Sequence, residues 1–378
     1  MLCVDHDDPD TAFVYVWSET VPPKGMLANI DLIDDKKLSL RCRYLFLTDD
    51  SGNFIPDQTA NSSQETLSQI YILLHRRGRG FRGIWRGPKG SGAIRLRPKT
   101  SQGRKVADLC NNWDDFKQWA SRSRNVNDIA CYRGHGDSNF KVSTSFHRDG
   151  KQRIDRFVYG NLATFHDHAQ TFLNRGINLK DGSEYATLLA LAQHHGLPTP
   201  MLDATRSPYI AAFFAFSDFL DNRSHRKPTP KYVRVYGFSR YFLDHHTPPS
   251  VSIHFPKPYI SRLRVSGIHN PRLSAQQGEF LVTNIADLET TIQEMETATG
   301  KTFMVAADIP SSFAAEALED LSFMGLTAAN MFPGLDGICR MLRHQAHFVR
   351  RQMENSVATS GKDILPTNDS LWGEPEPK

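Results

Sequence analysis

The chain has 378 residues, of which 39% are hydrophobic and 23% are charged, and its formal net charge at pH 7 is +4. At about 150 residues per domain this length predicts two domains, and it excludes a disulfide mini-scaffold. The longest apolar run, residues 209–216, is far shorter than the about 20 residues of a membrane span, and the five cysteines form no Cys-x-x-Cys pair. We therefore expect a cytoplasmic protein with reduced thiols, no membrane partner and no bound metal.

Residues 1–100 have the pattern of a small β-rich module. Segments 12–17 and 38–47 are rich in β-branched and aromatic residues, and turn-forming residues separate them. Between residues 63 and 74 the apolar residues recur at helical spacing, which predicts one short amphipathic helix. Residues 98–105 are short of apolar side chains, so we expect a linker there.

The end of this module is strongly basic. From His75 to Lys105 there are eleven Lys or Arg residues and no Asp or Glu. The alternation in 84–86 and 93–97 predicts two strands joined by a turn at 87–90. A basic stretch with interleaved aromatic rings can hold a phosphate backbone and stack bases, which makes nucleic acid a candidate partner; the alternative is a solvated hairpin face. The candidate contacts are Arg76, Arg77, Arg79, Arg82, Trp85 and Arg86.

From residue 106 onward, helical and strand patterns alternate, which predicts a second domain over 106–355 and an α+β fold. Asn111 and Asn112 precede a helix, a buried strand is expected at 129–132, and Ser183 is a candidate N-cap for a helix that stops at Gly196. Ser207 and Pro208 begin an all-apolar helix. Further strands are expected at 232–238, 252–255, 280–283 and 303–307, closing helices at 312–324 and 335–352, and a disordered tail at 357–378.

Several short segments of this second domain carry a resemblance to a known family. Tyr132-Arg133-Gly134 follow the expected buried strand, the helix end over 189–199 reads LALAQHHGLPT, and MLDAT follows over 201–205. With residues 272–278 and 332–337, these segments resemble the FRG-domain proteins, which are named for a Phe/Tyr-Arg-Gly tripeptide. The helix end and the segment after it carry the resemblance, because Phe81-Arg82-Gly83 repeats the tripeptide elsewhere in the chain.

The order of polar residues is also similar to that of ADP-ribosyltransferases. In that family an Arg or His on the first strand opens the NAD site, a Ser/Thr segment lies in the middle, and a late strand supplies Gln/Glu-x-Glu. Here the corresponding order is Arg133, then 143–145 or Ser207, then Gln277-Gly278-Glu279. The resemblance implies a mixed sheet with a split-sheet core and NAD as the ligand. Gln277 and Glu279, two residues apart, would share one face of a strand.

These resemblances and the residue chemistry define the candidate site. The candidate catalytic residues are Glu279, Arg133, His195 and Gln277. The candidate NAD-binding residues are Arg133, Gly134, His194, Asp203, Ser207 and Gln276. A single pocket is expected to collect six of these side chains, namely Arg133, His194, His195, Asp203, Gln277 and Glu279.

Each candidate also has a structural alternative. Arg133 can anchor a core carboxylate, and the two histidines can meet the dipole at a helix C-terminus. Asp203 and Ser207 can cap helices, and Glu279 can be a solvated residue on a strand.

Three classes of function are open at this point. The first is an effector of the toxin or phage-defence type that transfers ADP-ribose from NAD, or cleaves NAD, with the N-terminal module selecting an unknown target. The second is a metal-dependent nuclease, although the chain has no clustered carboxylate pair for two metals. The third is a non-catalytic module that binds nucleic acid or protein through residues 75–105.

Overall fold

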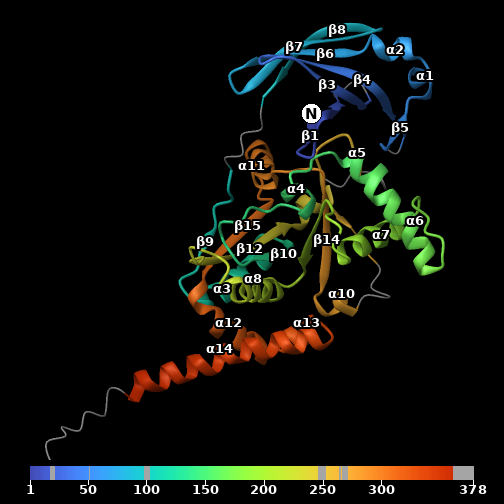
Figure 1. The fold of residues 1–378 in the computed structure, drawn as a ribbon. Helices are drawn as coiled ribbons and strands as arrows, with labels where there is room; N and C mark the ends of the chain where they lie inside the picture. The colour runs from blue at the N-terminus through green and yellow to red at the C-terminus, as the bar shows by residue number, and fades with distance from the viewer. Residues whose placement is uncertain are drawn as a thin grey trace, which may run out of the picture.

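The computed structural model describes residues 1–17, 22–50, 52–97, 103–245, 253–263, 265 and 271–360 (Figure 1). Two β-sheets organise these residues, one from the N-terminal part and one from the rest, and helices surround the second sheet. The chain is therefore an α+β protein with a mixed second sheet, as the sequence predicts. None of its helices within these ranges combines the length and the apolar character needed to cross a bilayer.

The N-terminal sheet is antiparallel throughout, in the order β1-β2-β3-β4-β6-β7-β8, and β5 pairs with the end of β4. Two short helices, α1 (Gln58–Asn61) and α2 (Gln64–Ser68), lie between β5 and β6. The strands are β1 (Leu2–Asp5), β2 (Asp8–Val16), β3 (Lys24–Asp34), β4 (Lys37–Thr48), β5 (Phe54–Pro56), β6 (Tyr71–Arg77), β7 (Gly80–Gly87) and β8 (Gly90–Leu96).

The helix expected over 63–74 is wrong in its second half. Helix α2 ends at Ser68, and the chain from Tyr71 is strand β6, which is bonded to β4 on one side and to β7 on the other. Ile72 and Leu74 are buried while their neighbours are less so, which is the two-residue period of a strand. The expected hairpin is confirmed, with Gly87 opposite Gly90 at its turn.

The second sheet has the order β13-β14-β11-β10-β12-β15-β9, and its neighbours are antiparallel except β15 and β9. Strands β10 and β11 share a single registered pair, Tyr132 with Thr205, so the sheet divides into two halves that meet at one point. The strands are β9 (Asp108–Leu109), β10 (Ile129–His135), β11 (Met201–Thr205), β12 (Tyr232–Ser239), β13 (Ile260–Leu263), β14 (Gly278–Thr283) and β15 (Met304–Pro310).

Helices cover both faces of this second sheet. Helix α8 packs on β10 and β12 through a fully buried apolar cluster, as its apolar sequence predicts, while α9 and α11 contribute to the cluster on the opposite face. The helices are α3 (Trp113–Val126), α4 (Ser145–Arg148), α5 (Ile154–Arg156), α6 (Ala163–Leu173), α7 (Gly182–His194), α8 (Pro208–Asn222), α9 (Arg240–His245), α10 (Pro271–Ala275), α11 (Leu288–Thr299), α12 (Ala314–Phe323), α13 (Ala328–Met331) and α14 (Leu335–Ser360).

Two expected boundaries in this part of the chain need correction. Helix α7 is capped by Asp181, whose carboxylate accepts the backbone N–H groups of Ser183 and Glu184, and Ser183 lies inside the helix. Residues 253–255 are not a strand, and residue 252 lies outside the described residues. Prolines at 256 and 258 cannot donate backbone hydrogen bonds, and strand β13 begins only after them.

The ends of the two expected domains also differ from the predicted pattern. Residues 98–102 of the expected linker lie outside the described residues, but Gly103 and Lys105 donate their backbone N–H groups to Thr290 and Glu289 of α11. This end of the linker is therefore tied to the second sheet's helices. At the other end, α14 continues to Ser360, so the first residues of the expected disordered tail are helical, and residues 361–378 lie outside the described residues.

The N-terminal sheet and the helices of the second part meet at a buried polar and aromatic contact. Asp5 accepts the backbone N–H of Arg153 at 2.8 Å and the side chain of Arg156 at 2.8 Å. The ring of His254 is fully buried against Phe13 and other aromatic rings of β2, β4 and β5. Buried charges need such partners, so this contact fixes how the two parts meet.

Candidate functional site

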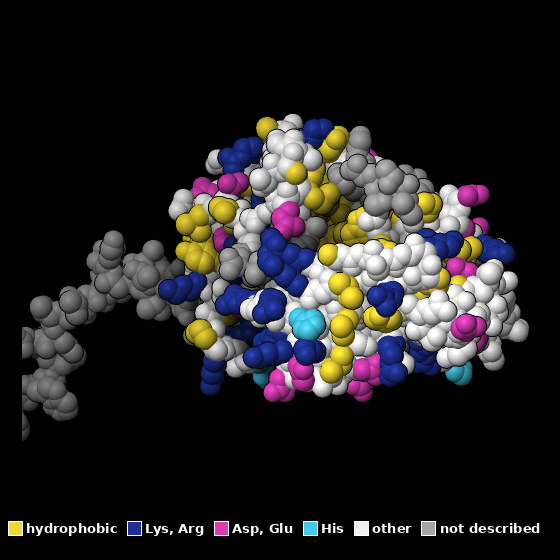
Figure 2. Space-filling model, turned by 90° about the horizontal axis from the view of Figure 1, so that it is seen from above, with side chains coloured by type: hydrophobic (Ala, Val, Ile, Leu, Met, Phe, Trp, Pro, Cys, Tyr) yellow, Lys and Arg dark blue, Asp and Glu magenta, His cyan; other side chains and the backbone are white. Residues whose placement is uncertain are grey.

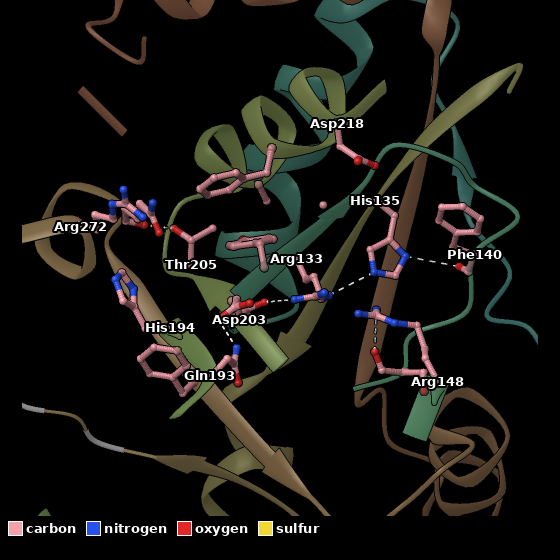
Figure 3. Close-up of a pocket in the computed structure, with 18 of the residues that line it drawn as sticks. Arg133, His135, Phe140, Arg148, Gln193, His194, Asp203, Thr205, Asp218 and Arg272 are labelled. Carbon is pink, nitrogen blue, oxygen red and sulfur yellow. Dashed lines mark hydrogen bonds between the residues drawn. The ribbon is translucent and has the colours of Figure 1, made fainter. Parts of the chain in front are cut away.

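A pocket of about 880 Å³ opens where the two halves of the second sheet part. Its walls come from β10 and the loop after it, Arg148 of α4, the end of α7, strand β11, one side of α8, helix α10, and Phe280 and Phe332 (Figure 3). This volume lies within the about 300–1,000 Å³ that is usual for small-molecule sites. The pocket is the candidate functional site.

Each residue of the Tyr132-Arg133-Gly134 tripeptide has a different task on β10. The Tyr132 hydroxyl is buried and lies 2.9 Å from the Ser123 hydroxyl of α3. A Cβ on Gly134 would lie 1.9 Å from the Ala211 carbonyl oxygen of α8, so the glycine lets the helix approach the strand. The third residue, Arg133, lines the pocket. Gly134, a candidate NAD-binding residue, therefore has a packing role, and it also lines the pocket.

Arg133 is held from two sides in the pocket. Its Nη1 donates to the carbonyl oxygen of Asp203 at 2.5 Å, and its Nε donates to Nε2 of His135 at 3.1 Å (Figure 3). Burial, and secondarily the charge of Arg133, lowers the pKa of His135 to about 3, so the ring is neutral and can accept this bond. Burial also lowers the pKa of Arg133, but a guanidinium stays charged at neutral pH.

The helix end that resembles the family positions Asp203. Gln193, in the last turn of α7, donates to the Asp203 carboxylate at 2.5 Å and accepts from the buried Thr199 hydroxyl at 2.5 Å. The amide side chain of Gln193 therefore links the end of α7 to the loop that follows it and to β11. Asp203 itself is exposed to the pocket and caps no helix, so the capping alternative is wrong for it.

The charges around the pocket are unbalanced. Among its cations, Lys141 pairs with Asp287 at 3.6 Å and Arg226 pairs with Asp218 at 2.9 Å. Within the described residues, no carboxylate oxygen lies within 4 Å of the guanidinium groups of the other three, Arg133, Arg148 and Arg272. Arg148 and Arg272 lie on opposite sides of Arg133 in Figure 3. A partly enclosed site with three such arginines suits an anion.

Aromatic rings complete the walls. Phe140, Phe214, Phe280 and Phe332 line the pocket, and the rings of Phe214 and Phe332 lie 5.9 Å apart, nearly perpendicular. Arg226 lies 4.9 Å over the Phe140 ring. The pocket can therefore hold flat ring systems as well as charge, because an aromatic wall packs well against a heterocycle.

The structure brings together only part of the expected set of site residues. The pocket lining includes Arg133, Gly134, His194, Asp203 and Gln276. It does not include His195, Ser207, Gln277 and Glu279. Of the six side chains that were expected to converge, three line this pocket: Arg133, His194 and Asp203.

The residues outside the lining have other partners or are exposed. Ser207 is the N-cap of α8 and accepts the Ile210 N–H at 3.3 Å. The Gln277 carbonyl accepts the backbone N–H of Arg206. His195 is exposed at the end of α7, with its ring 5.2 Å from that of His194.

Glu279 lies close to the pocket but is not part of its lining. Its carboxylate is 3.8 Å from Nε of Arg206, and its side chain is 20% exposed. It stands opposite Ala204 in the sheet, and the next residue, Phe280, lines the pocket. Successive side chains of a strand point to opposite faces, so Glu279 and Phe280 cannot both face the same way.

Sequence reasoning missed several residues of the pocket. Gln193 stands within the family-like helix end, and Arg272 within another of the matching segments, so both carried a signal that was not assigned a role. His135 directly follows the tripeptide. Arg148 and Asp218 carried no signal, because only the folded chain brings them beside β10.

The basic residues of the N-terminal module lie on a different surface. Arg76, Arg77, Arg79, Arg82 and Arg86 are all exposed on or near strands β6 and β7. Trp85 is also exposed, but it pairs with Ile72, whose side chain is in the core of this sheet. Its ring therefore points to the face opposite to Arg82 and Arg86, because side chains alternate along a strand.

The comparisons with known proteins identify one part of the chain. Residues 128–224 match the family described as the FRG domain, which confirms the resemblance read from the sequence. This match spans β10 to α8 and so contains most of the pocket. No curated protein and no solved structure matches the chain. No group of three or more His, Cys, Asp or Glu side chains in the described parts is placed to hold a metal ion.

Proposed function

We propose that the FRG domain of this chain binds NAD in the pocket between the halves of its sheet and breaks the bond between nicotinamide and ribose. The ADP-ribose is then passed to water or to an acceptor group. The observation that carries this proposal is the set of three arginines, Arg133, Arg148 and Arg272, none of which has a carboxylate oxygen within 4 Å among the described residues. A ligand with a diphosphate and two ring systems satisfies both these charges and the aromatic walls.

Two further features support a ligand of this size and charge. Arg133 is already oriented by Asp203 and His135, so its entropy cost on binding is small. Strands β10 and β11 share one registered pair and then part, and this opening gives a ligand room between the two halves of the sheet. The neutral ring of His135 adds no competing charge near the diphosphate.

The chemistry requires a carboxylate near the ribose. As the C1′–N bond breaks, its electron pair leaves with nicotinamide and positive charge develops on the ribose; an oxygen nucleophile then bonds to C1′ and loses its proton to water. Two carboxylates line the pocket, Asp203 and Asp218. Asp218 is paired with Arg226, whereas Asp203 is oriented by the neutral side chain of Gln193. We assign Asp203 the electrostatic role that the sequence had given to Glu279, since a fixed negative charge stabilises such a transition state.

The proposal is tested by NAD binding and nicotinamide release with the full chain. Arg133→Gln should weaken NAD binding about 10- to 100-fold, since charged hydrogen bonds contribute about 1.5–3 kcal/mol. Arg206→Gln is the matched control, because Arg206 is exposed and outside the pocket lining, and it should bind NAD as the wild type does. Asp203→Asn should keep binding and lose nicotinamide release.

Three results would count against parts of this proposal. NAD binding that Arg133→Gln leaves unchanged would overturn the pocket assignment. Loss of turnover in Glu279→Gln, with turnover kept in Asp203→Asn, would return the carboxylate role to Glu279. Binding without nicotinamide release in the wild type would leave a nucleotide-binding module and no glycosidic chemistry.

A further inference from the structure

The outer face of the N-terminal sheet carries a concentrated positive charge that the pocket does not use. Eight Lys or Arg residues occur between residues 76 and 97, and the chain has no Asp or Glu from residue 66 to residue 107. The strand register places Arg82, Arg86 and Arg95 on the outer face, whereas Arg76 stands opposite Phe81 on the core side. Among the described residues, none of these eight has a carboxylate oxygen within 4 Å. Lys and Arg side chains gather on this upper face around a histidine (Figure 2).

The strand register arranges part of this charge in a row. Arg95 of β8 lies opposite Arg82 of β7, Arg82 opposite His75 of β6, and His75 opposite Lys37 of β4. Neighbouring strands are about 4.8 Å apart, so the row extends about 14 Å across four strands. Arg95, Arg82 and His75 have no acidic residue beside them in this row. Only Lys37, at the end of the row, has an acidic partner, with its Nζ 3.7 Å from the Asp34 carboxylate.

A second row lies four residues further along each strand, on the same face. It contains Arg41, Tyr71, Arg86 and Ser91 in neighbouring strands, and Arg41 is paired with Asp31 at 2.5 Å. The strip between the rows is uncharged and includes the exposed Ile84. The face therefore presents positive charges about 13 Å apart along the strands, with a neutral strip between them.

The strand register places like charges opposite each other, which lowers the stability of the folded sheet. Like charges directly opposite each other in a sheet are destabilising, and Arg82 and Arg95 form such a pair. The charges of Arg97 and Arg82 also lower the pKa of Arg95, as expected for like charges close together. A polyanion that neutralises several charges at once relieves this repulsion.

We propose that this face, centred on Arg82, Arg86, Arg95 and Arg97, binds the phosphate backbone of nucleic acid. The spaced charges suit a chain that carries a phosphate on every nucleotide. A lipid surface fits less well, because in the described strands β6, β7 and β8 the exposed large apolar side chains are Ile84 and Trp85, and Trp85 points to the opposite face. Binding is expected to depend little on base sequence, because a row of guanidinium groups contacts phosphates and not base edges.

The test uses the full chain and a labelled single-stranded 20-nucleotide RNA, with fluorescence anisotropy at several salt concentrations. With four phosphates neutralised, affinity should fall about 50-fold between 50 and 200 mM salt. Replacing the four arginines of the face by Gln should remove most binding at low salt and flatten the salt dependence. The matched control makes the same change in charge at four exposed residues of the second part, Arg175, Lys180, Arg223 and Lys227, and should bind as the wild type does.

A single substitution separates loss of binding from loss of folding. Arg82→Glu places a carboxylate opposite Arg95 and should keep or raise the melting temperature while weakening RNA binding at least tenfold. Equal losses in the face variant and the control variant, binding that does not change with salt, or preference for anionic vesicles over RNA would each overturn the proposal. NAD binding should be unchanged in all of these variants, so this proposal and the pocket proposal can fail independently.

Discussion

Replacing Gly134 by alanine tests the packing of α8 against β10 more directly than any change to a polar residue. A Cβ at this position would lie 1.9 Å from the Ala211 carbonyl oxygen, 2.9 Å from the Ala211 carbonyl carbon and 3.0 Å from the Ala215 nitrogen. All three are backbone atoms of a helix, so no side chain can rotate away. The closest of these contacts is more than 1 Å shorter than the closest approach that a Cβ makes in real proteins, so the helix must move away from the strand.

The cost follows from what α8 buries. The helix packs seven buried residues into the cluster that it shares with β10 and β12, and moving it loosens many of those contacts together. Overpacking a well-packed core costs about 1–3 kcal/mol and sometimes more. We expect Gly134→Ala to lower the free energy of unfolding by about 3 kcal/mol, measured by urea denaturation. NAD binding should also weaken, because Phe214 and Asp218 of α8 line the pocket.

Gly160 provides the matched control for this experiment. It lies in an exposed helical turn, and a Cβ there would meet nothing within 4 Å. Gly160→Ala should therefore raise the free energy of unfolding by about 0.5–1 kcal/mol, because alanine loses less backbone freedom than glycine on folding. If Gly134→Ala is as stable as the wild type, the close approach of α8 does not explain the glycine, and a ligand contact becomes the better account.

Two further predictions follow from buried groups. Burial, and secondarily the charge of Arg153, lowers the pKa of His254 to about 3. The pKa of a histidine in the unfolded chain is about 6.5, so between these two pH values the unfolded state binds one more proton than the folded state. Stability should therefore fall as pH falls below about 6.5, and His254→Phe should reduce this loss by about 1.4 kcal/mol per pH unit in urea denaturation; an unchanged slope would refute the burial argument. For the thiols, burial raises the pKa of Cys131, whereas Cys339 is exposed, so a thiol reagent should label Cys339 at once and Cys131 only after unfolding; rapid native labelling of Cys131 would contradict its burial.

Local interactions account for the elements that the sequence determined by itself. Ser207 followed by Pro208 fixes the start of α8, and the cap hydrogen bond forms within the first turn. Gly87 and Gly90 close the β7–β8 hairpin through a turn whose residues suit it without help from the rest of the fold. The family-like helix end also belongs to this class, because Gln193 bonds to both Thr199 and Asp203 within a segment of eleven residues.

Tertiary structure decided those elements whose local sequence pattern favours one conformation while their neighbours in the fold favour another. Residues 71–74 have apolar side chains that suit a helix face, but β4 and β7 offer hydrogen bonds on both sides, and the strand forms. Sheet pairing also set the direction of Trp85, which the basic stretch alone could not indicate, because a shift of one residue reverses the face of a side chain.

The composition of the pocket was decided in the same way. Arg148 and Arg272 line the same pocket as Arg133, although Arg272 comes from a segment far along the chain. Glu279 is turned to Arg206 by the register of β14 against β11. Residue types and spacing indicate which side chains can bind an anion. Which of them meet depends on long-range strand pairing and helix packing, whose energies are shared among many residues and are not encoded in any short segment.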